Sequence, residues 1–150
     1  MGILKRLTSW WSGGDDSHGE APETGSFDVE QFIYVKIPGH IEPIERGEIE
    51  DRIEPLLRET NLGEISGGGS QLGDARPDGT RPIEFCGIDI DTTDRDAALE
   101  LLRSLLPTLN VPTGTELHYT RQGVRLLDRY VASGWELELS RTQLHPGFDI

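Results

Sequence analysis

Residues 83–107 read IEFCGIDIDTTDRDAALELLRSLLP, and this stretch decides the fold. Its first part alternates between residue classes, which predicts a strand over residues 83–91. One face of this strand carries Cys86, Ile88 and Ile90, and the other carries Phe85, Asp89 and Asp91. The leucines that follow recur at helical spacing up to Pro107, which cannot continue a helix. The stretch therefore predicts a strand that leads directly into a helix.

The rest of the chain supplies the partners of this strand and helix. Periodicity predicts further strands over residues 31–38, 62–72, 116–120 and 135–140, and further helices over residues 45–60 and 123–132. The order is β-α-β-β-α-β, followed by one more helix and strand. This order predicts an α+β, ferredoxin-like split β-α-β sandwich with four antiparallel strands and two helices on one face. Residues 123–140 either extend the sheet or cover its open face.

The domain is expected to begin at residue 27. Residues 13–31 contain six carboxylates and no Lys or Arg, with Gly, Ser and Pro between them. Such a composition buries too little apolar surface to offset the entropy of ordering. We therefore expect a flexible acidic segment over residues 1–26 and one domain over residues 27–150, a usual domain size.

Composition narrows the classes of partner and the cellular setting. The 27 acidic residues outnumber the 14 basic ones, and the net charge of −13 disfavours nucleic acid and favours a basic protein. Cys86 is the only cysteine, so an intramolecular disulfide is impossible and a cytoplasmic setting is expected. No stretch is long and apolar enough to span a membrane. Trp10 and Trp11 lie in a short apolar and basic segment for which membrane contact is not expected, and their role stays open.

No metal or cofactor site is predicted. The four histidines do not form the spacings that are typical of metal ligands. The run from Asp89 resembles a calcium loop, but Asp94 occupies the position where such a loop requires glycine. We therefore expect no cofactor and no bound metal.

Two short motifs resemble a known group of proteins. Residues 63–69 (GEISGGG) and 86–91 (CGIDID) resemble a pattern found in small, uncharacterised bacterial α+β domains. Some domains of this kind look like partner-binding modules, including toxin-neutralising immunity proteins. The resemblance spans about residues 32–120 and implies a protein partner. It brings no catalytic residues.

The candidate site is a surface on the open face of the sheet. Alternation predicts that it carries Phe32, Tyr34, Phe85, Asp89 and Asp91. Aromatic rings beside carboxylates suit a partner that offers Arg, Lys and apolar groups. The function expected is therefore non-catalytic protein binding, whereas the opposing interpretation is that the last predicted helix or a second subunit buries the aromatic rings as core.

Two other functions stay open. A small hydrolase or isomerase would use Asp89 or Asp91 with His118 as an acid/base pair, and needs these side chains to meet. A structural homo-oligomer, such as a dimer, would instead bury the aromatic rings against a second copy of the chain.

Overall fold

The structure is a computed structural model, and it describes residues 27–142. The expected acidic segment over residues 1–26 and the tail over residues 143–150 lie outside the described residues. Within the described part, no helix has the length and apolar character needed to cross a membrane.

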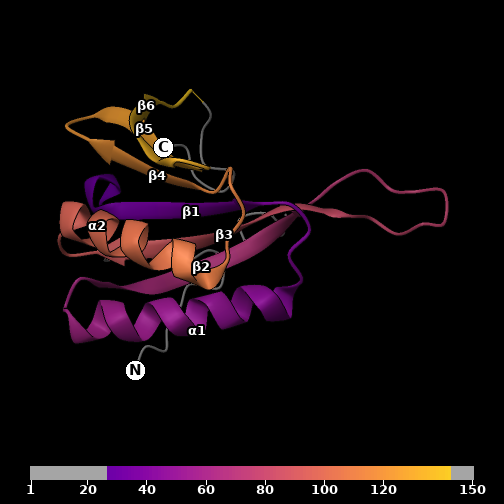
Figure 1. Cartoon of the computed structure of the whole chain (residues 1–150), viewed down its shortest axis with the longest axis horizontal. Helices are drawn as coiled ribbons and strands as arrows, with labels where there is room; N and C mark the ends of the chain where they lie inside the picture. The colour runs from indigo at the N-terminus through magenta and orange to yellow at the C-terminus, as the bar shows by residue number, and fades with distance from the viewer. Residues whose placement is uncertain (1–26, 143–150) are drawn as a thin grey trace.

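A six-stranded antiparallel sheet with two helices forms the α+β domain (Figure 1). The order of strands across the sheet is β2-β3-β1-β4-β5-β6. The strands are β1 (Phe32–Pro38), β2 (Gly63–Leu72), β3 (Ile83–Thr92), β4 (Glu116–Arg121), β5 (Val124–Val131) and β6 (Gly134–Ser140). The helices are α1 (Pro43–Glu59) and α2 (Arg95–Leu105), with short 3-10 helices η1 (Val29–Gln31) and η2 (Leu106–Leu109).

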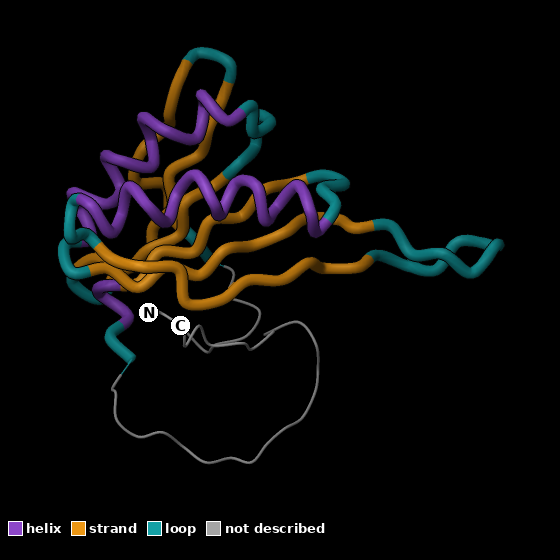
Figure 2. Tube along the Cα trace, turned by 90° about the horizontal axis from the view of Figure 1, so that it is seen from below, coloured by secondary structure: helices purple, strands orange, loops and turns teal. Residues whose placement is uncertain are grey.

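Both helices pack on the same face of the sheet (Figure 2). Every second side chain of the central strand β1 points to them, and these side chains are fully buried in the core: Ile33, Val35 and Ile37. Ile53 and Leu57 of α1, and Leu99 and Leu102 of α2, complete that core. Burying one such side chain contributes roughly 1.5–3 kcal/mol, so the alternation in β1 fixes which sheet face meets the helices.

The ends of the helices have local causes in the sequence. Glu42 and Glu45 form a reciprocal capping box at the start of α1, and Pro43 occupies its first turn. The Asp94 side chain accepts a hydrogen bond from the Ala97 amide at 3.1 Å and caps α2. Both caps satisfy amides that have no partner inside the helix.

The helix predicted over residues 123–132 is wrong, because this segment forms strand β5. Gln122 and Gly123 have φ angles of 54° and 79°, and two consecutive left-handed residues form the tight turn of a β-hairpin. The spacing of Val124, Leu127 and Tyr130 resembles a helix only because strand alternation also places apolar residues three apart on opposite faces. Residues 123–140 therefore extend the sheet with β5 and β6 rather than covering it.

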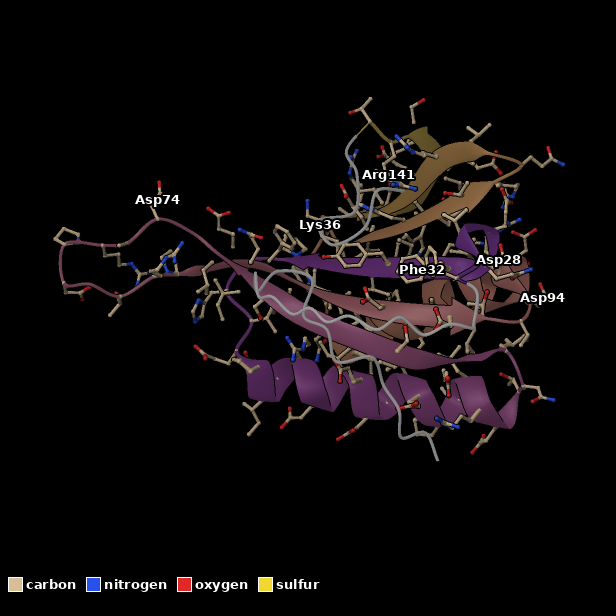
Figure 3. All side chains as sticks on the ribbon, turned by 180° about the vertical axis from the view of Figure 1, so that it is seen from behind. Asp28, Phe32, Lys36, Asp74, Asp94 and Arg141 are labelled. Carbon is tan, nitrogen blue, oxygen red and sulfur yellow. The ribbon has the colours of Figure 1, made fainter. Side chains whose placement is uncertain are left out.

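The loop between β2 and β3 projects from the rest of the molecule (Figure 1). At its base the loop continues the hairpin ladder, since the amide of Gly73 donates to the carbonyl of Pro82 at 2.8 Å. Residues 74–81 are exposed, and the label of Asp74 marks this loop in Figure 3.

Candidate functional site

The strand register brings the five predicted surface residues onto one sheet face. Phe32 lies opposite Asp91, and Tyr34 lies opposite Asp89, on the paired strands β1 and β3. Phe85 lies opposite Pro38 in the same ladder. Directly opposed residues of an antiparallel pair share a face, and this face is the one without helices. We call it the open face, and Figure 3 looks toward it, with Phe32 and Lys36 of β1 labelled.

The open face is buried at its centre. Phe32 is 2% exposed, and Tyr34 and Asp89 are each 1% exposed. Phe85 and Asp91 are half-buried at its margin. Phe27 packs edge-on against Phe32 with ring centroids 5.1 Å apart. The chain therefore enters the described domain on this face, at one end of β1.

Tyr34 occupies the middle of the open face. Its ring packs edge-on against His118 at 5.6 Å and passes over Gly87, where a Cβ atom would collide with the ring and its hydroxyl. Burial, and then the nearby Asp89 carboxylate, raise the pKa of Tyr34. The side chain is therefore a neutral phenol at physiological pH, and it separates Asp89 from His118.

His118 does not meet the carboxylates of β3. Tyr34 pairs with Asp89 on one side and with His118 on the other, so the latter two lie two strands apart. Two strand spacings amount to about 9.5 Å, well beyond hydrogen-bond reach. His118 instead bonds the Glu116 carboxylate at 2.8 Å. This geometry does not support the acid/base pair considered from the sequence.

Burial sets the protonation of the His118–Glu116 pair. It lowers the pKa of His118, outweighing the carboxylate of Glu116, and the charges of Arg141 and Lys36 act in the same direction as burial. Burial alone would raise the pKa of Glu116, but hydrogen bonds from His118 and Arg129 hold that pKa below its usual value. The neutral imidazole therefore donates to an ionised carboxylate.

A cavity of about 260 Å³ adjoins this pair. Its lining contains three cationic side chains and one carboxylate: Lys36, Arg129, Arg141 and Glu116. Lys36 also lies over the Phe85 ring at 4.6 Å, which is within cation–π distance. Arg141 donates to the Tyr119 carbonyl of β4 at 3.0 Å and to the Leu126 carbonyl of β5 at 3.1 Å, and so lies across both strands. The sequence interpretation missed the residues that line this cavity. Glu116 and His118 were a possible signal, because residues two apart in a strand point to the same face.

A second polar cluster lies on the helix side of the sheet. Asp128 is fully buried and accepts hydrogen bonds from Arg103 of α2 at 2.7 Å and from the Tyr119 hydroxyl at 2.7 Å. The Glu138 amide, from a residue with φ of 58° beside a bulge in the ladder, donates to the same carboxylate. Because this cluster joins α2 to β4, β5 and β6 and has all its groups bonded, it is structural. The predicted helix over residues 123–132 concealed it.

Cys86 faces the helix side of the sheet and is fully buried. Burial raises the pKa of its thiol to about 12, so the nucleophilic thiolate is not formed near neutrality. Among residues 27–142, no group of three or more His, Cys, Asp or Glu side chains could hold a metal ion.

Comparison of the chain with known protein families, with curated proteins and with solved structures finds no match.

Proposed function

We propose that this protein is a non-catalytic binding module that takes a basic and apolar polypeptide segment on the open face of its sheet. The observation that carries the proposal is the register of β1 and β3, which sets Phe32 and Tyr34 beside Asp91 and Asp89 on the sheet face opposite both helices. Aromatic rings bind apolar side chains and cations, and carboxylates bind Lys and Arg.

The remainder of the molecule supports binding to a protein. The net charge of −13 steers cationic partners toward the domain and repels nucleic acid. A sheet face whose strands are hydrogen-bonded is also rigid. Binding to it therefore costs little conformational entropy, because the surface is already ordered.

The proposal extends to fold family and setting. The four strands in the order β2-β3-β1-β4, with a helix after β1 and another after β3, support a ferredoxin-like assignment. On this assignment β5 and β6 are an added hairpin at one edge. We also propose that the protein is cytoplasmic and that it is related to small bacterial partner-binding domains.

A comparative capture experiment tests the binding role. The full chain is immobilised, and lysate of the source cell is passed over it beside an Asp89→Asn/Asp91→Asn variant. These isosteric changes remove two charges and keep the side-chain volume. We expect one basic protein to be retained by the parent and lost with the variant, and to be released from the parent by raised salt, since surface charge attraction is screened.

The matched control carries the same change of net charge on the other side of the molecule. Asp51 and Glu59 are exposed on α1, so Asp51→Asn/Glu59→Gln should retain the same partner as the parent. Identical sets of retained proteins for all three chains, with each chain folded by circular dichroism, would contradict the proposal.

A further inference from the structure

The cavity that adjoins the His118–Glu116 pair is cationic in an otherwise acidic protein. Its volume is about 260 Å³, and its lining comes from β1, β4, β5 and β6 and from the two residues that follow β6. Among the lining residues that the structure describes, three are basic and one is acidic, although acidic residues outnumber basic ones in the whole chain. Positive charge therefore gathers at this place against the overall charge of the protein.

The strand register sets the charges of the cavity in one row across the sheet. Lys36 of β1 lies opposite Glu116 of β4, and Glu116 lies opposite Arg129 of β5. Opposed residues of neighbouring strands have Cβ atoms about 5 Å apart, so the carboxylate lies between two cations. Arg129 donates to Glu116 through Nε at 3.1 Å and compensates its negative charge.

Two of the cations retain donors for a ligand. In the part of the chain that the structure describes, the Lys36 ammonium lies over the Phe85 ring at 4.6 Å and makes no hydrogen bond or salt bridge. Arg129 uses Nε on Glu116, whereas its Nη1 is 3.8 Å from Glu136, which is too far for a hydrogen bond. A guanidinium has further N–H donors, so both side chains can bind an acceptor in the cavity.

Residues at the end of β6 complete the lining. Ser140 and Thr142 are exposed and bring hydroxyl groups, whereas Arg141 between them is buried (Figure 3). The Arg141 guanidinium donates to carbonyls of β4 and β5, which fix its position. Burial lowers the pKa of His118, and the positive charges of Arg141 and Lys36 lower it further. The two cations therefore act on the same small region.

These donors suit an oxyanion. Ammonium and guanidinium groups bind phosphate through charge-assisted hydrogen bonds, which are about twice as strong as neutral ones. Pockets that enclose a whole small molecule measure roughly 300–1,000 Å³. This cavity is smaller, so it suits one anionic group with some water rather than a complete cofactor.

We propose that this cavity binds one phosphate-type oxyanion, whose oxygens accept hydrogen bonds from Lys36, Arg129 and the Ser140 hydroxyl. The net charge of −13 does not prevent this, because the field of distant carboxylates is screened within about 8 Å at physiological ionic strength. The ligand is free phosphate or the phosphate group of a small ester, since both present the same oxygens. The site goes beyond the proposed binding of a basic polypeptide, and neither depends on the other.

Titration of the full chain with inorganic phosphate, at constant pH and ionic strength, tests the site. Amide chemical shifts are followed by NMR. We expect saturable changes concentrated at Lys36, Arg129 and residues 140–142, with a dissociation constant in the millimolar range or lower. Lys36→Gln should weaken binding at least about tenfold, because it removes a charge-assisted hydrogen bond. Changes that rise linearly with phosphate, or that saturate elsewhere in the molecule, would overturn the site.

Two further variants separate the site from overall charge. Arg52→Gln removes the same charge as Lys36→Gln at an exposed position of α1, so it should bind phosphate as the parent does. Glu116→Gln removes the carboxylate of the lining and should tighten binding by about threefold or more, since a like charge no longer repels the anion. Equal weakening by Arg52→Gln and Lys36→Gln would show that net charge alone governs binding, and would overturn the site.

A comparison of ligands identifies the source of the oxyanion. Methyl phosphate should compete with inorganic phosphate for the same shifts, and the tighter of the two identifies an ester or free phosphate as the ligand. Acetate has only two oxygens and one charge, so it should bind several-fold more weakly than either. Acetate binding as tight as that of phosphate would overturn the assignment of a phosphate-type ligand.

Discussion

The ring of Tyr34 fits in its place only because the neighbouring strand has a glycine, Gly87, beneath it. Its ring lies directly over Gly87, where any Cβ atom would overlap the ring and the hydroxyl. Glycine usually weakens a strand interior, yet at this position its missing side chain makes room for an aromatic one. The glycine therefore shapes the centre of the open face.

Gly87→Ala should lower the free energy of unfolding by about 1–3 kcal/mol, the usual penalty for overpacking a buried site. The measurement is urea unfolding, in the parent and in a Tyr34→Leu background. In that background the penalty should nearly vanish, because the overlapping atoms are gone. Gly47 of α1 has open space around its Cβ position, so Gly47→Ala should instead stabilise the protein by about 0.5–1 kcal/mol. An equal penalty for Gly87→Ala in both backgrounds would show that Tyr34 is not its cause.

One buried carboxylate and one indole join the strands at the C-terminal edge of the sheet to α2. Asp128 of β5 bonds Arg103 of α2, Tyr119 of β4 and the backbone of Glu138 in β6. The Trp135 indole of β6 also donates to the Arg103 carbonyl at 3.0 Å. These contacts connect the β5–β6 hairpin to α2.

Asp128→Ala should destabilise the protein by about 3 kcal/mol, because it leaves the buried Tyr119 hydroxyl and the largely buried Arg103 without their acceptor. Asp128→Asn should lower the stability less than Asp128→Ala, because asparagine retains an oxygen that accepts hydrogen bonds. Chemical denaturation of both variants beside Asp51→Asn, an exposed control on α1, is the measurement. A loss for Asp128→Ala that matched the control would show that the cluster does not hold the hairpin.

The stability of the whole molecule should depend on pH near neutrality. Burial lowers the pKa of His118, so below about pH 6.5 the unfolded chain binds a proton that the folded chain does not. The free energy of unfolding must therefore fall as the pH falls, by at most about 1.4 kcal/mol per pH unit for one group. The depressed pKa of Glu116 acts in the same direction, but at pH values below its usual 4.5.

His118→Gln should flatten the decrease of Tm between pH 7 and pH 5, because glutamine still donates to Glu116 but does not titrate. His40 is exposed, so His40→Gln serves as the control and should keep the slope of the parent. Thermal unfolding followed by circular dichroism at several pH values is the measurement. Parallel Tm curves for the parent and His118→Gln would assign the pH dependence to other groups.

The whole molecule has two unlike sheet faces. One face packs against both helices and contains the aliphatic core, whereas the other gathers aromatic rings and carboxylates. The alternation in β1 and β3 determines both faces at once, since neighbouring residues of a strand point in opposite directions. The candidate binding surface and the core therefore have the same origin in the sequence.

The sequence by itself determined β1 to β4 and β6, both helices and the composition of the open face, because these depend on local periodicity. Phe32, Tyr34, Phe85, Asp89 and Asp91 share a face as alternation predicts. The segment over residues 123–132 was misassigned, because the turn at Gln122 and Gly123 was not recognised and a few apolar residues fit either period.

Only the tertiary structure decided which distant residues meet. Strand order places Tyr34 between Asp89 and His118, and so keeps apart two groups that the sequence allowed to form a pair. The Asp128 cluster depends on contacts among four elements that are far apart in the chain. Local pattern sets the direction of a side chain within its own strand or helix, whereas its neighbours depend on strand order and register. These are fixed by the packing of the whole core.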